Sequence, residues 1–192
     1  MESQRILLRN FNELDVDAVF AYRSLPEVAK YQYWEPITKE EARLFVKDYS
    51  HPRFDVSFKW NALAIILKEN HELIGDCSLR LVIDKVEVGC IIAPKYQQQG
   101  FAKEALGQLI NYCFANMAVD EVYGITDSEN AASIRLMESL HMVKALDFEE
   151  KLECKGCLCV EYKYVIRKSD WLNYSSSAIN SFGVNTLIFF TF

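Results

Sequence analysis

The stretch that most constrains the fold runs from Val86 to Met142 and is centred on a short loop between a predicted strand and a predicted helix. The apolar strand pattern over 86–93 is broken by Pro94, a polar loop ends at Gly100, and an amphipathic helix pattern follows. The N–H groups of such a loop and of the first helical turn have no intrahelical acceptor. The loop can therefore hold a phosphate, and a simple tight turn is the alternative.

Two widespread phosphate-binding motifs do not account for this loop. The sequence has no Gly-Lys-Ser/Thr, so it is not a P-loop. It also has no Gly-x-Gly-x-x-Gly, which the dinucleotide-binding fold requires.

The hydrophobic pattern predicts a mixed α/β domain with seven strands. The strands are predicted at 6–9, 60–67, 73–83, 86–93, 121–127, 143–154 and 157–167. The spacing around the intervening helix predicts that 86–93 and 121–127 are parallel and joined by a right-handed crossover. Lys155-Gly156 predicts a two-residue hairpin turn.

Four helices are predicted from their caps and apolar spacing. The first begins near Asn12 and Asp15, places Leu14, Ala18, Tyr22 and Leu25 on one side, and ends at Pro26. The second begins at a capping box over 38–41, so two helices precede the main sheet. The others follow Gly100 and Asn130.

Composition narrows the class of protein. The 192 residues suit a single domain with a substantial core. A net charge of -6 argues against a nucleic-acid partner. The charged start Met-Glu-Ser-Gln-Arg leads directly into a strand pattern, so we expect no signal peptide. No stretch of these residues approaches the ~18–20 apolar residues that span a bilayer. Cys77, Cys90 and Cys113 lie inside apolar patterns, as small buried side chains do, which favours a reducing, cytoplasmic setting. We expect no membrane partner.

A cluster of cysteines, Cys154-x-x-Cys157-x-Cys159, invites a zinc or redox interpretation. A closed zinc site needs four ligands, and no second Cys/His pair is spaced to complete it, so we expect no metal. Across a two-residue turn, Cys154 and Cys157 would oppose each other and could form a disulfide on oxidation. The histidines are scattered and look like loop or helix-end residues: His51, His71 and His141.

The loop contains Gln97-x-x-Gly100-x-Ala102, which resembles the Gln/Arg-x-x-Gly-x-Gly/Ala motif of the GNAT superfamily of acetyl-CoA-dependent N-acetyltransferases. It looks closest to the ribosomal-protein N-acetyltransferase (Rim-type) branch. The supporting stretches are Leu25-Pro-Glu-Val, Leu73-Ile-Gly-Asp, Val88-Gly-Cys-Ile-Ile-Ala-Pro, Ala102-Lys-Glu-Ala, Asp127-Ser-Glu-Asn-Ala-Ala-Ser-Ile-Arg-Leu and Ser-Asp-Trp171. One departure is that Gln98 or Gln99 replaces a second loop glycine, which predicts a stiffer loop.

The resemblance implies a GNAT domain over 1–171 and an apolar tail over 172–192 outside the family pattern. It implies a twisted, mostly antiparallel seven-stranded sheet, splayed between the fourth and fifth strands, with helices on both faces. Acetyl-CoA would lie in that gap. Its pantetheine arm and phosphates would be held by Cys90, Ile91, Ile92, Ala93, Gln97, Gln98, Gln99, Gly100, Phe101, Ala102, Lys103, Asn130, Ser133 and Arg135. Asn130, Ser133 and Arg135 could instead be a helix cap and solvated side chains.

The resemblance also implies direct transfer to an amine, with no metal. The N–H of Ile92 or of its neighbour would stabilise the oxyanion, and Ser133 would protonate the departing thiolate. Glu87 is the favoured base, and it could equally be an ordinary strand-edge carboxylate. Asp76 and Glu104 are other candidates for the base.

The acceptor leaves the weakest pattern in the sequence. Tyr33 and Trp34 would line its entrance or, equally well, plug the core. A protein N-terminus is the favoured acceptor, and a small amine such as a polyamine or an aminoglycoside is the alternative. A CoA-binding module without catalysis is the alternative to an enzyme. The β-prone run over 186–192 must be covered, either by its own domain or in a homodimer.

Overall fold

The molecule is built on one sheet of seven strands in the order β1-β2-β3-β4-β5-β7-β6. The computed structural model describes residues 1–181, with side chains as far as residue 174. All neighbouring strands are antiparallel except the parallel pair β4–β5, so the predicted fold class is confirmed. The strands are β1 Ile6–Arg9, β2 Trp60–Leu67, β3 Leu73–Val82, β4 Lys85–Ile92, β5 Glu121–Asp127, β6 Val143–Cys154 and β7 Cys157–Arg167.

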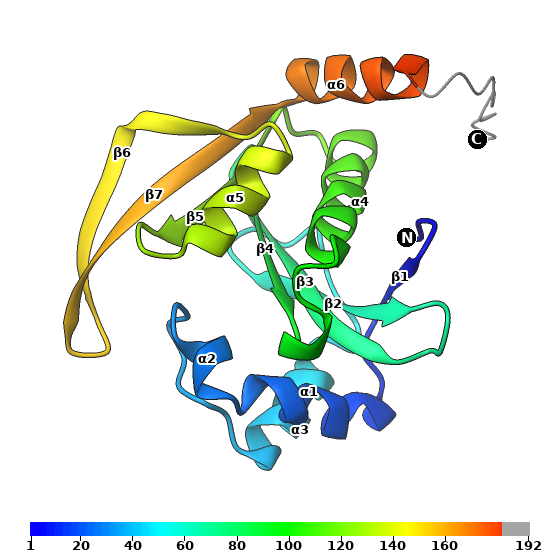
Figure 1. The fold of residues 1–192 in the computed structure, drawn as a ribbon, viewed down its shortest axis with the longest axis vertical. Coiled ribbons are helices and arrows are strands. Elements are labelled where there is room, and N and C mark those ends of the chain that lie inside the picture. The colour runs from blue at the N-terminus through cyan, green and yellow to red at the C-terminus, as the bar shows by residue number, and fades with distance from the viewer. Residues whose placement is uncertain (182–192) are drawn as a thin grey trace.

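Helices cover both faces of the sheet (Figure 1). One core lies under α4, α5 and the start of α6, and a second lies under α1 and α3. The α-helices are α1 Val16–Arg23, α2 Pro26–Ala29, α3 Lys39–Asp48, α4 Phe101–Asn116, α5 Ala131–Ser139 and α6 Lys168–Ser181, and the short 3-10 helices are η1 Glu13–Asp15 and η2 Pro94–Tyr96.

The first predicted helix differs from the observed one. Asn12 and Asp15 form a capping box around η1, and this tight turn precedes α1. Leu14 is 92 % exposed, so the prediction that it shares one side of the helix with Tyr22 is wrong; the buried residues of α1 include Val19 and Tyr22. Pro26 does not simply end that helix. It begins α2, so three α-helices rather than two lie between β1 and β2.

Strands β4 and β5 separate along their length. They pair only at Lys85↔Glu121, Val86↔Val122 and Glu87↔Tyr123. Beyond that point β4 continues against β3 as far as Ile92, and β5 continues against β7 as far as Asp127. The predicted splay is confirmed, and it leaves one edge of β4 without a strand partner.

The β6–β7 hairpin forms as the sequence predicts. Cys154 pairs with Cys157 across the turn, and Lys155 and Gly156 have φ angles of 54° and 75°. Two positive φ angles in a two-residue loop define a type I′ turn, the type that matches the twist of a hairpin.

The chain remains helical beyond the predicted end of the compact pattern. Trp171 lies in α6, is buried, and donates from Nε1 to Asn111 Oδ1 at 2.7 Å. The first part of the predicted tail, which is rich in serine and asparagine, continues this helix to Ser181. The apolar run over 186–192 lies outside the described residues. Within the part that is described, no helix has both the length and the apolar character needed to cross a membrane.

Candidate active site

The loop before α4 presents an array of backbone donors. In the described part of the chain, the N–H groups of residues 98–103 donate to no acceptor, whereas Gln97 N–H is bonded to Pro94 O and Glu104 N–H to Gly100 O. Gly100 caps the helix with φ 83°. Such an array at a helix N-terminus attracts an anion through both its N–H groups and the helix dipole.

Loop geometry assigns the departure from the usual glycine pattern to one residue. Gln98 has φ 60°, a left-handed conformation that glycine adopts without strain. The Gln97 side chain turns back and donates from Nε2 to Ile92 O at 2.9 Å. This bond ties the loop to the end of β4.

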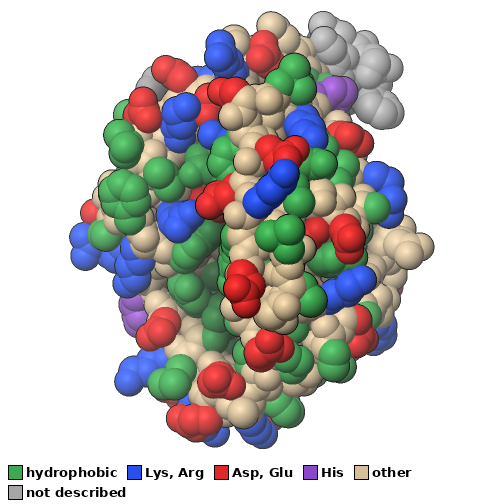
Figure 2. Space-filling view, turned by 90° about the vertical axis from the view of Figure 1, so that its left-hand side faces the viewer, with side chains coloured by type: hydrophobic (Ala, Val, Ile, Leu, Met, Phe, Trp, Pro, Cys, Tyr) green, Lys and Arg blue, Asp and Glu red, His purple; other side chains and the backbone are tan. Residues whose placement is uncertain are grey.

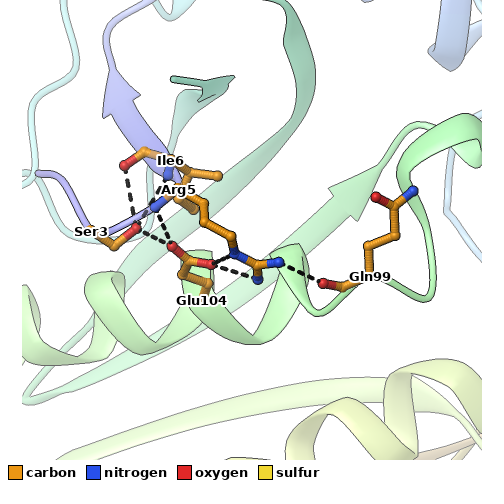
Figure 3. A network of polar contacts seen from close by, with 5 residues as sticks. All are labelled: Ser3, Arg5, Ile6, Gln99 and Glu104. Atoms are coloured by element: carbon orange, nitrogen blue, oxygen red, sulfur yellow. Dashed lines mark hydrogen bonds and ion pairs between the residues drawn. The ribbon is translucent and has the colours of Figure 1, made fainter. Parts of the chain in front are cut away.

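A polar network anchors the other side of the loop (Figure 3). Arg5 Nη1 donates to Gln99 O at 3.0 Å, and Arg5 Nε donates to Glu104 Oε2 at 2.7 Å. The Arg5 N–H and the Ser3 hydroxyl donate to the other oxygen of Glu104. Although burial opposes ionisation, these bonds lower the pKa of Glu104. Glu104, considered as a base from the sequence, thus joins the N-terminal segment to α4.

The edge of β4 that faces the splay carries free main-chain groups. Ala93 N–H donates to Ile74 O of β3 at 2.8 Å. Because main-chain groups alternate between the two edges of a strand, the Ile92 and Cys90 N–H groups point the other way, toward the gap. The side chain of Ile91 packs in the second core under α1 and α3, and Ile92 packs under α4.

Helix α5 begins on the far side of the gap. Asn130 caps it, with Oδ1 accepting the Ser133 N–H at 3.1 Å. The Ser133 hydroxyl makes no hydrogen bond to any residue described, and its side chain is half-buried. Arg135 is exposed on the same helix and forms no ion pair there with a described residue.

Glu87 lies at the point where β4 and β5 separate, on the same face as Ile91. It is 7 % exposed, and its Oε2 accepts from Arg80 Nε at 3.1 Å and from the Tyr123 hydroxyl at 3.3 Å. Burial and the Glu87 charge raise the pKa of Tyr123 to about 12, so this hydroxyl remains a donor. Oε1 accepts no bond from a described residue. Every fully buried side-chain oxygen in the described part of the chain has a partner, so Oε1 is not fully buried and water can reach it.

Asp76, the third candidate base, forms a buried ion pair. Its side chain is 2 % exposed and lies 2.8 Å from Arg23 Nη2. The Tyr22 hydroxyl donates to the same carboxylate. Burial and the Asp76 charge hold the pKa of Tyr22 well above its usual value. The triad supports the packing of α1 on β3.

The two aromatic residues expected at the acceptor entrance have different environments. Trp34 is half-buried, and the Arg23 guanidinium lies 4.9 Å from its ring centroid, so it belongs to the second core. Tyr33 is 70 % exposed and donates its hydroxyl to Glu161 of β7. Glu161 pairs with Asp127, the last residue of β5. Tyr33 therefore lies beside the end of β5. The last residue of β5, Asp127, precedes Asn130, the cap of α5, by three residues.

Sequence reasoning missed several residues that complete these surroundings. The position of Glu161 opposite Asp127 depends on the pairing of β7 with β5, which the hairpin turn does not determine. Arg5 and Lys155 make contacts between segments that are far apart in the chain. No local sequence pattern predicts such contacts.

A model of the acetyltransferase (GNAT) domain matches residues 5–143. The chain belongs to the GNAT acetyltransferase family. Its fold is the GNAT fold, and its activity class is acetyl-CoA-dependent N-acetyl transfer. This family binds acetyl-CoA and an amine acceptor, consistent with the gap and loop described above.

Similar proteins act on different amines. An uncharacterized N-acetyltransferase p20 from Bacillus licheniformis is 29% identical over 88% of this chain and 96% of its own. The structure of spermidine N-acetyltransferase from Vibrio cholerae with CoA and spermine has a TM-score of 0.73 at 20% identity, covering 88% of this chain and 98% of that one. RimL, a ribosomal L7/L12 α-N-protein acetyltransferase in complex with CoA, has a TM-score of 0.72 at 18% identity, covering 86% and 95%. These two structures show the shared GNAT fold alone.

The cysteines of this GNAT chain are all free thiols in the described part of the molecule. Burial raises the pKa of Cys113 to about 12, which makes it a poor nucleophile. Cys154 and Cys157 oppose each other across the turn, as expected. Among the residues described, no group of three or more His, Cys, Asp or Glu side chains is arranged to hold a metal.

Proposed function

We propose that this GNAT enzyme acetylates the α-amino group of a protein N-terminus, with acetyl-CoA lying between β4 and β5. The observation that carries the placement of acetyl-CoA is the presence of two sets of free donors, one on the open edge of β4 and one in the loop before α4. The N–H groups of residues 98–103 would hold the pyrophosphate. The N–H group of Cys90 on the open edge of β4 would bond the extended pantetheine arm, as an added strand would.

The side chains around the gap then have separate tasks. The Ile92 N–H donates toward the thioester oxygen, where charge develops during transfer. Asn130 bonds the pantetheine amide while capping α5. The Ser133 hydroxyl, uncommitted to any described residue, supplies a proton to the departing thiolate. Arg135 lies on the exposed side of α5, within the region where we place the 3′-phosphate of CoA.

Glu87 is the proposed base, acting through water. One oxygen is held by Arg80 and Tyr123, which fixes the carboxylate, and the other accepts no bond from a described residue and is not fully buried. The proton taken from the amine would pass through this water to bulk solvent.

The acceptor enters from the face that carries α2 and the β6–β7 hairpin. This face is hollowed, with hydrophobic side chains in the depression and both acidic and basic ones around it (Figure 2). Glu161 belongs to β7 of this hairpin, and burial raises its pKa, with the Glu150 and Asp127 charges adding to the rise. An open entrance bordered by Glu161 and the exposed Tyr33 suits the charged end of an extended peptide. The same carboxylates favour a polyamine as the second candidate.

An acceptor screen tests the proposal. Purified protein with acetyl-CoA is given lysine-free peptides with free α-amino groups, spermidine and an aminoglycoside, and products are identified by mass spectrometry. We expect acetylation at the peptide N-terminus. If spermidine were the only amine acetylated, the acceptor would be a polyamine and not a protein N-terminus. Tight CoA binding with no CoA release on any amine would indicate a module without catalysis.

Arg5→Ala tests the support of the loop before α4. The Gln99 carbonyl loses its donor and Glu104 Oε2 loses the Arg5 guanidinium, so the free N–H groups are less well ordered. We expect the KM for acetyl-CoA to rise about fivefold, the equivalent of roughly one hydrogen bond, with kcat little changed. Arg53→Ala, which removes an exposed ion pair with Asp55, is the control. Equal KM values for both variants and the wild type would remove Arg5 from cofactor binding.

A further inference from the structure

The tip of the β6–β7 hairpin is attached to the segment that follows α2. Lys155 Nζ donates to Ala29 O at 2.9 Å and to Trp34 O at 2.8 Å, and it lies 3.5 Å from Glu35 Oε2. An ammonium group has three N–H donors, and here three acceptors surround it. The side chain is only 24 % exposed, unusual for lysine at the tip of a hairpin.

The acceptors of the Lys155 ammonium lie at the two ends of one loop. Ala29 ends α2 and Trp34 lies near the end of the aromatic loop, so one ammonium closes the loop over 29–34 at both ends. The middle of the same loop is attached to the same hairpin, because the Tyr33 hydroxyl donates to Glu161. The loop, which has few regular backbone bonds of its own, is thus held against β7 at the end of β5.

Resting on the proposed function above, we infer that Lys155 is a positioning residue for the acceptor. It fixes the loop over 29–35 as one wall of the acceptor entrance and thereby places Tyr33 beside Glu161. Lys155 itself lies at the hairpin tip and touches neither the loop before α4 nor Ser133. Its loss should therefore affect the amine and leave acetyl-CoA binding intact.

Lys155→Asn removes the ammonium without weakening the turn. Asn-Gly is the favoured sequence for a type I′ turn, and residue 155 has φ 54°. The matched control is Lys151→Asn on β6, whose Nζ lies 3.6 Å from Glu149 and which is 64 % exposed. Both variants lose one positive charge from the same hairpin, so they share any long-range electrostatic effect on the acceptor.

Two measurements are made on the full chain. The first is steady-state kinetics with acetyl-CoA and whichever probe the wild type acetylates, a lysine-free peptide or spermidine. We expect Lys155→Asn to raise the amine KM about tenfold, as for loss of charge-assisted hydrogen bonds, with kcat and the acetyl-CoA KM within about twofold. The second is hydrogen–deuterium exchange of peptides covering 29–37, which should be several times faster in this variant. The Lys151→Asn protein should match the wild type in both.

Two results would overturn the positioning role of Lys155, and a third would overturn the proposed function. An unchanged amine KM overturns the positioning role, even if exchange is faster. A raised KM with unchanged exchange also overturns it, because Lys155 would then act on the amine directly. If the wild type acetylates neither probe, the proposed function fails, and the exchange measurement alone decides whether Lys155 fixes the loop.

Discussion

Gly100→Asp is expected to abolish measurable acetyl-CoA binding. Gly100 caps α4 with φ 83°, and the new carboxylate would lie among the N–H groups of residues 98–103. It would compete with the pyrophosphate for the same donors and repel it. We expect a loss of affinity of at least about 100-fold, or ~2.7 kcal/mol, in isothermal titration calorimetry with CoA.

A second glycine provides the control for backbone strain. Gly156 has φ 75°, close to that of Gly100, but a Cβ there would meet open space at the tip of the β6–β7 hairpin. Gly156→Asp therefore carries a similar conformational cost, on the order of 1–2 kcal/mol, without approaching the cofactor slot. If Gly156→Asp weakened CoA binding as much as Gly100→Asp does, general destabilisation would explain the result. Unchanged affinity in Gly100→Asp would refute the loop assignment.

Local patterns predicted the parts of the fold that short-range chemistry determines. The strand, loop and helix around Gly100 follow from alternation, a proline and a glycine within one short stretch. The β6–β7 hairpin follows from Lys155-Gly156, because two residues with positive φ set the register of both strands. The splay was inferred through family resemblance, since nothing in the two strands themselves says where their pairing stops.

The parts that were not predicted depend on distant or finely balanced contacts. Leu14 is exposed in η1, the 3-10 turn that the Asn12–Asp15 capping box encloses before α1 begins. Residues 173–181 are polar and rich in serine, yet they extend a helix that Trp171 anchors on α4. The contact of Lys155 with Trp34 O spans 121 residues and leaves no periodic trace in the sequence.

The donor and acceptor sides of the site are supported by different parts of the chain. Arg5 and Gln97 hold the loop before α4, whereas Lys155 and Glu161 hold the loop after α2. Substitutions on one side should therefore change the KM of one substrate and not of the other. Only groups at the junction, Ile92, Ser133 and Glu87, are expected to change kcat.

Ser133→Ala is expected to lower kcat about 100-fold, the usual contribution of a positioned general acid, while the CoA affinity changes less than about threefold. The reason is that the Ser133 N–H, which bonds Asn130 Oδ1, remains in the variant. The cap of α5 is therefore kept, and only the uncommitted hydroxyl is lost. Stopped-flow or steady-state release of CoA measures kcat, and calorimetry measures the affinity.

Ser139→Ala separates this role from a general effect on α5. Ser139 lies on the same helix, and its hydroxyl donates to Leu136 O at 2.7 Å, so the same atom is removed from a structural position. That variant should retain nearly full kcat. If Ser133→Ala also retained it, the thiolate would have to take its proton from water. The gap between β4 and β5 would then contribute placement and the Ile92 N–H alone, and the catalysis would rest on holding the two substrates together.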